Sequence, residues 1–289
     1  QLACTARRLP AHQAVPIINA NINRDIDNDD PYLPLLWWWA VEQHSIDGRD
    51  EVLHGFVRPT LWKSQLGRDF LLPRLTRRYA ADTTSASLNS VARLLQAAPD
   101  DAARRPLWSA VLQGWKEQPA ATAANFTSTA QTHEFCQMVS DAWSAAPGDL
   151  VLTALAVSLR HRPALEAATS DAFRTSTDAN RRVALLELLA QTNDRALVRP
   201  AQRLVQSQQA VAVRQAALRI LARFEEPHVT KSLINLLAST SGTASTLHSQ
   251  VRSILLSRPS SAHDFVAAVD RGHVKAESVP LEQIRQVAL

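Results

Sequence analysis

The chain has 289 residues, of which 46% are hydrophobic, so it is long enough to bury a sizeable core. Only 7 residues are glycine, which disfavours many-stranded folds with tight turns and excludes a glycine-rich phosphate-binding loop. The net charge of +4 is a weak indication of a polyanionic partner, and the isolated Cys4 and Cys136 provide neither a zinc framework nor a covalent haem motif.

The first 145 residues predict a series of helices without a regular repeat. An acidic turn precedes Pro31, where Asp29 or Asp30 is suited to cap the helix that follows. That helix, Tyr32–Gln43, is apolar on all sides, which is typical of a buried helix, and its apolar stretch is too short to cross a bilayer. We expect helices over Leu2–Leu9, Gln13–Ile22, Tyr32–Gln43, Asp47–Val57, Trp62–Arg78, Ser85–Ala97, Ala102–Glu117 and His133–Ser144.

From about residue 146 the predicted helices become repetitive. An offset of 32 residues places Arg182 on Arg214 and, in the partner helices, Arg199 on Lys231. This spacing indicates helix pairs that bury their apolar faces against one another. The expected helices are Leu150–His161, Ala164–Phe173, Arg181–Gln191, Arg195–Gln206, Val211–Phe224, Pro227–Ala238, Leu247–Ser257 and Ala262–Asp270.

The segment Val211–Ala238 resembles a HEAT repeat. Its first helix has the form VRxxAxxxL, which includes Arg214 and Ala217, and a turn with Pro227 leads to a second helix that ends in a leucine-rich pattern. The resemblance implies an all-α fold, an α-solenoid or superhelix of HEAT-like antiparallel helix pairs. We therefore expect two parts: an irregular, Trp-rich helical portion over residues 1–145 that caps the stack, and HEAT-like repeats over 146–289.

A second resemblance lies in the segment Asp25–Glu42. It is similar to a D-x-x-[IL]-P-L-L-x-W-W-A-x-E motif of large bacterial proteins that fuse a sorbosone/glucose-dehydrogenase-like propeller, HEAT-like helices and a c-type cytochrome. The matching residues are Asp29, Asp30, Pro31, Leu33, Pro34, Leu35, Leu36, Trp38, Trp39, Ala40 and Glu42. Together with Arg182, Arg214 and Ala217 of the repeats, Asp30, Pro31, Pro34, Trp38, Trp39 and Glu42 form the structural signature of the chain.

This second resemblance implies that the chain is the middle module of an exported protein, periplasmic or at the cell surface. The chain opens at Gln1 without a leader, and we expect it to end inside a helix, Glu282–Leu289, so both ends look cut. Neither the propeller nor a haem motif lies within the chain. We therefore expect no cofactor here, and the resemblance places haem c in the downstream part of the parent.

Three groups of residues suggest a site for a metal ion or for ring stacking. Asp25, Asp27, Asp29 and Asp30 resemble the start of a calcium loop, but Asp30 and Leu36 stand where an EF-hand requires Gly and Glu. Trp37–Trp39 could stack against sugars or bases, yet consecutive helical residues point about 100° apart, which favours core packing. The third group, a possible metal site without a known ligand spacing, comprises His44, His54, Glu42 and Glu51.

A nucleophile is suggested by His133 and Glu134 beside Cys136, although apolar Phe135 and Met138 favour a half-buried thiol.

We expect instead a non-catalytic scaffold or interaction module that binds protein, without a site for catalysis, cofactor or metal. Two alternatives remain. One is a metal- or sugar-dependent enzyme. The other is a HEAT-like nucleic-acid-binding protein or DNA glycosylase, whose concave face would carry Arg77, Arg78, Arg104, Arg105, Arg160, Arg162, Arg181 and Arg182.

Overall fold

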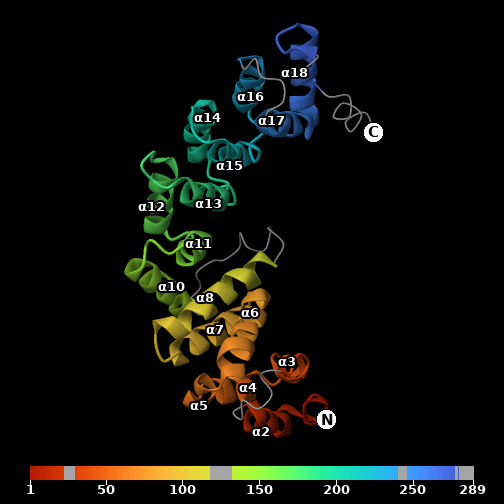
Figure 1. Ribbon diagram of the computed structural model, residues 1–289, viewed down its shortest axis with the longest axis vertical. Coiled ribbons are helices and arrows are strands. Elements are labelled where there is room, and N and C mark those ends of the chain that lie inside the picture. Colours follow the sequence, from red (N-terminus) through yellow and green to blue (C-terminus); the bar gives the residue numbers. More distant parts are fainter. Residues whose placement is uncertain (23–29, 118–131, 240–245, 277–278, 280–289) are drawn as a thin grey trace. The chain divides into compact units, whose positions relative to one another are not determined.

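The computed structural model describes residues 1–22, 30–117, 132–239, 246–276 and 279 (Figure 1). Within these residues every regular element is a helix and there is no strand, so the predicted all-helical fold is confirmed. The chain divides into two compact units, Gln1–His161 and Arg162–Leu289. The predicted division at residues 145 and 146 stays a prediction. The helix expected over Glu282–Leu289 lies outside the described residues.

Unit 1 is built around the pair α6 and α8, against which α7 packs. Helix α7 occupies the predicted range, and Asp100 caps α8 by accepting a hydrogen bond from the Ala103 N–H at 2.8 Å. The helices are α1 (Leu2–Ala6), α2 (Ala11–Ile22), α3 (Leu33–His44), α4 (Arg49–Phe56), α5 (Pro59–Lys63), α6 (Leu72–Asp82), α7 (Ser85–Ala97), α8 (Asp101–Lys116), α10 (His133–Ala145) and α11 (Leu150–Ser158).

The single helix predicted over Trp62–Arg78 is wrong, because the chain breaks at Ser64. This residue has an extended backbone, and its buried hydroxyl donates to the Ile22 carbonyl at 2.8 Å. A π-helical turn, η1 (Leu66–Leu71), then leads into α6. Pro73 follows this turn and has no N–H to donate, which is a common setting for a local change of helix geometry.

Helix α3 is not buried on all sides, contrary to the prediction. Trp37 is buried, but Leu35 and Trp39 are 37% and 46% exposed, and Tyr32 just before the helix is 73% exposed. Residues four apart lie on one face of a helix, so Leu35 and Trp39 form an apolar face without cover from the described residues. A uniformly apolar helix in this chain therefore packs on one side only.

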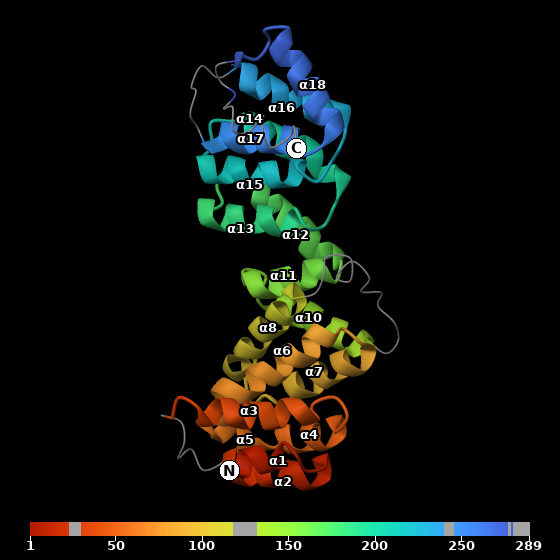
Figure 2. The same cartoon turned by 90° about the vertical axis from the view of Figure 1, so that its right-hand side faces the viewer.

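Unit 2 arranges its helices in two rows. Helices α13, α15 and α17 contact one another in order, as do α14, α16 and α18, and Figure 2 shows α13, α15 and α17 in one row. Asp178 caps α13, and Asp194 caps the short η2 (Arg195–Leu197), as their positions predict. The helices are α12 (Arg162–Phe173), α13 (Ala179–Leu189), α14 (Val198–Gln206), α15 (Val211–Leu221), α16 (Pro227–Ser239), α17 (Thr246–Leu256) and α18 (Pro259–Asp270).

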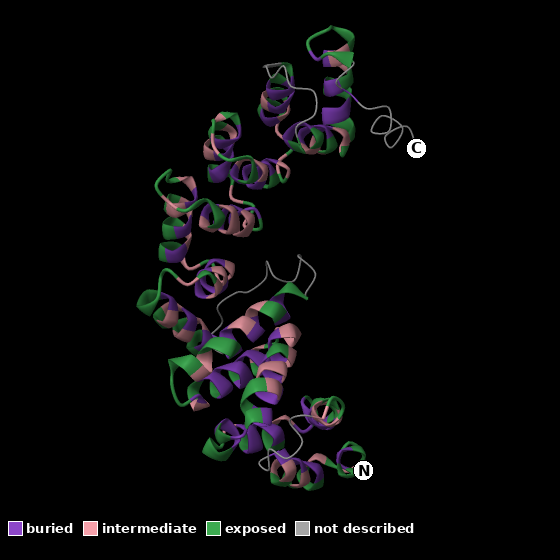
Figure 3. Ribbon diagram, viewed as in Figure 1, coloured by how far each residue is buried: buried purple, intermediate pink, exposed green. Residues whose placement is uncertain are grey.

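Burial follows the 32-residue offset in these helices (Figure 3). Pairs with both members buried include Leu185 and Ala217, Leu186 and Leu218, Leu189 and Leu221, Leu197 and Val229, Ala201 and Leu233, Leu204 and Leu236, and Val205 and Leu237. Equivalent positions therefore face the same neighbours, as they would in stacked helix pairs.

An arginine fixes the start of a helix against the end of the preceding helix at three places. Arg104, Arg182 and Arg214 are each the fourth residue of their helix. Their Nε atoms donate to the carbonyls of Leu95, Ala172 and Val205 at 3.0, 3.1 and 2.8 Å, each in the last turn of the previous helix. A cation at a helix carboxyl end satisfies an unpaired carbonyl and is attracted by the helix dipole.

Candidate functional site

The most prominent polar surface that the structure describes lies on α14 and α16 in unit 2. Arg199 and Arg203 are exposed one turn apart on α14, and exposed Lys231 lies on α16. None of the three has an ion pair or side-chain hydrogen bond within the described ranges. We call Arg199, Arg203 and Lys231 the cationic surface. Arg199 and Lys231 are equivalent under the 32-residue offset, so the repeat places a cation at the same position twice.

A groove of about 570 Å³ contains all three cations. Its other lining side chains are polar, namely Gln202, Gln206, His228, Ser232 and Asn235. Lys231 and Asn235 also line a second groove of about 650 Å³, which continues to Arg271 and His273 beyond α18 and includes one acidic residue, Asp264. Cationic side chains beyond the cationic surface therefore extend from α16 to the end of α18.

Little acidic charge opposes these cations. Glu226 is already used by Arg195, whose Nε lies 3.4 Å from its Oε1, and by His228 at 3.3 Å. Residues 162–289 carry 16 Lys and Arg against 11 Asp and Glu, a net charge of +5, whereas residues 1–161 carry 15 against 16. The net positive charge of the chain therefore comes from unit 2, which favours an anionic partner there.

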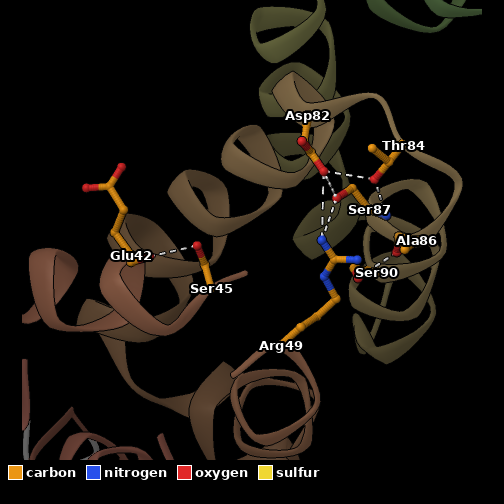
Figure 4. Close-up of polar contacts among 8 residues, drawn as sticks. All are labelled: Glu42, Ser45, Arg49, Asp82, Thr84, Ala86, Ser87 and Ser90. Carbon is orange, nitrogen blue, oxygen red and sulfur yellow. Dashed lines mark hydrogen bonds and ion pairs between the residues drawn. The ribbon is translucent and has the colours of Figure 1, made fainter. Parts of the chain in front are cut away.

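A second polar cluster lies in unit 1, where α4, α6 and α7 meet (Figure 4). The Ser87 hydroxyl donates to the Asp82 carboxylate at 2.5 Å and accepts a bond from Arg49 Nη2 at 3.0 Å. Thr84 donates to the same carboxylate at 2.8 Å, and the Arg49 guanidinium lies 5.6 Å from the centre of the Tyr79 ring. Ser87 is buried, and the bonds of Asp82, Ser87 and Arg49 join α4, α6 and α7, so we interpret the cluster as a link between helices.

The pKa of Asp82 reflects this arrangement. Burial raises it, but the hydrogen bonds from Ser87 and Thr84 and the charges of Arg49 and Arg78 outweigh burial, so the pKa lies below its usual value of 3.8. A carboxyl whose pKa is lower in the folded state stabilises the fold above its ordinary pKa. That contribution is lost as the pH falls through the lowered value.

Replacing Asp82 with Asn is therefore expected to lower the free energy of unfolding by about 1–2 kcal/mol at neutral pH, the usual cost of lost charged hydrogen bonds. The difference from the unmodified chain should shrink as the pH falls from 3.8 through the lowered pKa, because below that lowered value the carboxylate is protonated in both states. Urea unfolding at a series of pH values measures this, with exposed Asp47→Asn as the control. A difference that does not depend on pH would contradict it.

In the group suggested as a nucleophile, the acidic residue Glu134 already has another hydrogen-bond partner. His133 and Glu134 are exposed, and the Glu134 carboxylate accepts a bond from Gln96 Nε2 at 2.6 Å. The structure instead shows a pair that the sequence did not reveal, Ser140 Oγ and His161 Nε2 at 3.1 Å. The other ring nitrogen of His161 is buried without a partner in the described part of the chain, whereas a catalytic histidine needs an orienting group there.

The proposed metal ligands have other partners. His44 is buried and its Nε2 lies 3.0 Å from the Ala6 carbonyl, while exposed His54 pairs with Arg58. Among the residues that the structure describes, no group of three or more His, Cys, Asp or Glu could hold a metal ion. Asp25, Asp27 and Asp29 of the calcium-like run lie outside those residues.

The structural signature around α3 is placed as follows. Asp30 accepts hydrogen bonds from the N–H groups of Tyr32 and Leu33 at 2.7 and 2.9 Å, but the N-cap residue of α3 is Tyr32, so Asp30 binds the backbone at the helix start without occupying the predicted cap position. Exposed Pro31 precedes the helix, and Pro34 lies in its first turn. Trp38 is half-buried and Trp39 exposed, and only the backbone carbonyl of exposed Glu42 is used, by Ser45 (Figure 4). These residues shape a helix start and do not converge on a site.

Most arginines proposed to contact nucleic acid are engaged within the fold. Arg77 pairs with Glu117, Arg105 with Asp149, Arg162 with Glu166 and Arg181 with Asp171. Arg104 and Arg182 hold helix ends, and Arg182 is only 2% exposed. Because Arg182 is buried, the prediction that it contributes to a binding face is wrong; for the other arginines of the set it stays a prediction. Arg199, Arg203 and Lys231 of the cationic surface were not in the set.

No protein family matches the chain, and neither the curated proteins nor the solved structures contain a match. None of the described helices combines the length and apolar character needed to cross a membrane. In the residues that the structure describes, the chain belongs to the all-helical class of proteins.

Proposed function

We propose that the chain is a non-catalytic, HEAT-like helical-repeat module that acts as a scaffold or an interaction surface for other proteins. The observation that carries the proposal is the repetition in unit 2. Burial repeats at an offset of 32 residues, Arg182 and Arg214 hold equivalent helix ends, and Arg199 and Lys231 repeat an exposed cation. A stack of helix pairs presents an extended surface, and such a surface is better suited to binding a partner protein than to enclosing a substrate.

Deletion of one complete repeat, residues 179–210, tests this proposal. The new chain joins the Asp178 cap to α15 and brings Arg214 to the sequence position of Arg182, so the stack can close again. We expect the shortened protein to keep its helix content in proportion to its length and to unfold cooperatively. Circular dichroism and urea unfolding measure both properties.

The matched control removes only residues 195–210, which deletes α14 and leaves α15 without the helix against which it packs. We expect this half-repeat deletion to lose far more stability, because an apolar face is left uncovered. If both deletions unfold the protein equally, the helices are not interchangeable repeats and the scaffold proposal loses its basis.

The wider setting rests on the Asp25–Glu42 resemblance. We propose that the chain is the middle segment of an exported bacterial dehydrogenase and cytochrome c fusion, located in the periplasm or at the cell surface. Sequencing the gene on both sides tests this. A propeller-coding region upstream and a CxxCH codon pattern downstream are expected. A start codon directly before Gln1 with a stop codon after Leu289 would refute it.

A further inference from the structure

We infer that the cationic surface of Arg199, Arg203 and Lys231 binds an acidic, extended polypeptide segment through its carboxylates. This inference rests on the proposed interaction function and names the chemistry of the partner. The three side chains are exposed, share one groove and have no acidic or hydrogen-bonding partner within the part of the chain that the structure describes. Positive charge without an internal partner favours an anion from outside.

The spacing of the cations suits an extended chain. Arg199 and Arg203 are four residues apart on α14, which separates them by about 6 Å along the helix axis. Alternate residues of an extended peptide are separated by about 6.6 Å. Lys231 lies on the neighbouring helix α16, and packed helices are about 8–10 Å apart, close to the span of three extended residues. Carboxylates on alternate or third residues can therefore reach all three cations.

The groove also offers hydrogen-bonding groups to a peptide backbone. Gln202 and Gln206 donate from Nε2 to the His228 carbonyl and the Ser232 hydroxyl at 3.4 and 3.2 Å, which ties α14 to α16. Each donation leaves a side-chain carbonyl in the groove as an acceptor. Peptide N–H groups can donate to such acceptors, whereas phosphate groups cannot.

The same features argue against a nucleic acid. Proteins that bind single strands stack bases on aromatic side chains, and the lining of the groove includes no Phe, Tyr or Trp. Duplex binders neutralise many phosphates, often about 6–10, and this groove has three unpaired cations among the described residues. Arginine forms paired hydrogen bonds with carboxylates, so two arginines and one lysine suffice for a short acidic segment.

Fluorescence anisotropy with the whole chain tests the inference. The probe is a labelled peptide in which glutamate alternates with serine or glycine, and its control carries glutamine in place of every glutamate. We expect the glutamate peptide to bind about tenfold or more tightly than the glutamine peptide at moderate salt. The variant R199Q/R203Q/K231Q is expected to lose about tenfold in affinity.

A matched variant, R162Q/R174Q/R219Q, removes the same charge from exposed arginines of unit 2 outside the groove. We expect its affinity to fall by less than about threefold, since only long-range attraction is reduced. Equal losses in both variants, equal binding of both peptides, or tighter binding of single-stranded or duplex DNA of matched charge would each overturn the inference. The repeat deletion tests the proposal of stacked repeats independently of peptide binding. If only peptide binding fails, the acidic-peptide inference is rejected and the proposed function is not.

Discussion

Replacing Gly114 with alanine is expected to destabilise unit 1 by about 2 kcal/mol or more. Gly114 lies in α8 where this helix crosses α6, and an added Cβ would stand 2.6 Å from the Arg77 carbonyl oxygen and 2.9 Å from Ala80 Cβ. The Arg77 carbonyl oxygen belongs to the α6 backbone and Ala80 Cβ to a short side chain, so neither atom can move aside. The clash is relieved only if α6 and α8 separate. Overpacking costs about 1–3 kcal/mol and occasionally more, and the approach to rigid backbone places Gly114 at the upper end of this range, so about 2 kcal/mol remains after the gain of about 1 kcal/mol in helix propensity.

Gly148→Ala is the matched control, because nothing lies within 4 Å of a Cβ placed on Gly148. We expect its free energy of unfolding to change by less than about 0.5 kcal/mol. Urea unfolding followed by circular dichroism measures both variants. Equal stability of the two would show that α6 and α8 are less closely packed than the structure indicates.

The parts of the fold that the sequence predicted depend on local signals. The helix over Ser85–Ala97 begins after Thr84, whose hydroxyl accepts from the Ser87 N–H, and it ends before Pro99. Asp149 and Asp178 likewise cap the helices that follow them. In each case the residue that starts or ends the helix lies within a few positions of the helix boundary. A short stretch of sequence is therefore enough to predict that boundary.

The errors arise where a segment far away in the sequence determines the local structure or its burial. The break at Ser64 depends on the Ile22 carbonyl, which is 42 positions earlier in the chain. The exposure of Trp39 depends on which helices pack against α3, and composition alone does not state that. Sequence patterns record what a segment can bury, whereas tertiary contacts decide how much of it is buried.

The candidate site shows the same limit. The 32-residue offset placed Arg199 on Lys231, but nothing in the sequence distinguished them from Arg181 and Arg182. The structure separates the two groups, since Arg182 is buried and Arg181 faces Asp171, while Arg199 and Lys231 are exposed. A charged residue becomes a candidate for binding only when its surroundings are known.

Replacing Arg182 with alanine is expected to have the largest effect in unit 2, a loss of about 3 kcal/mol. The side chain is 2% exposed, and besides the Ala172 carbonyl its Nη1 reaches Gln209 Oε1 at 2.7 Å. Alanine would leave a cavity, which costs about 2–5 kcal/mol for large buried side chains, and would remove both hydrogen bonds. The equivalent Arg214 is half-buried, so Arg214→Ala should cost only about 1 kcal/mol.

Arg182→Met separates packing from hydrogen bonding, because methionine keeps a long apolar side chain but donates nothing. Burial lowers the pKa of the Arg182 guanidinium, and its Nη2 is buried without a partner among the described residues, so the charge itself is costly to bury. We therefore expect the methionine variant to lie between alanine and the unmodified chain in urea unfolding. A methionine variant as unstable as alanine would show that the bonds to Ala172 and Gln209 outweigh desolvation. Equal losses for Arg182→Ala and Arg214→Ala would contradict the role of burial, since both side chains hold the same kind of helix end.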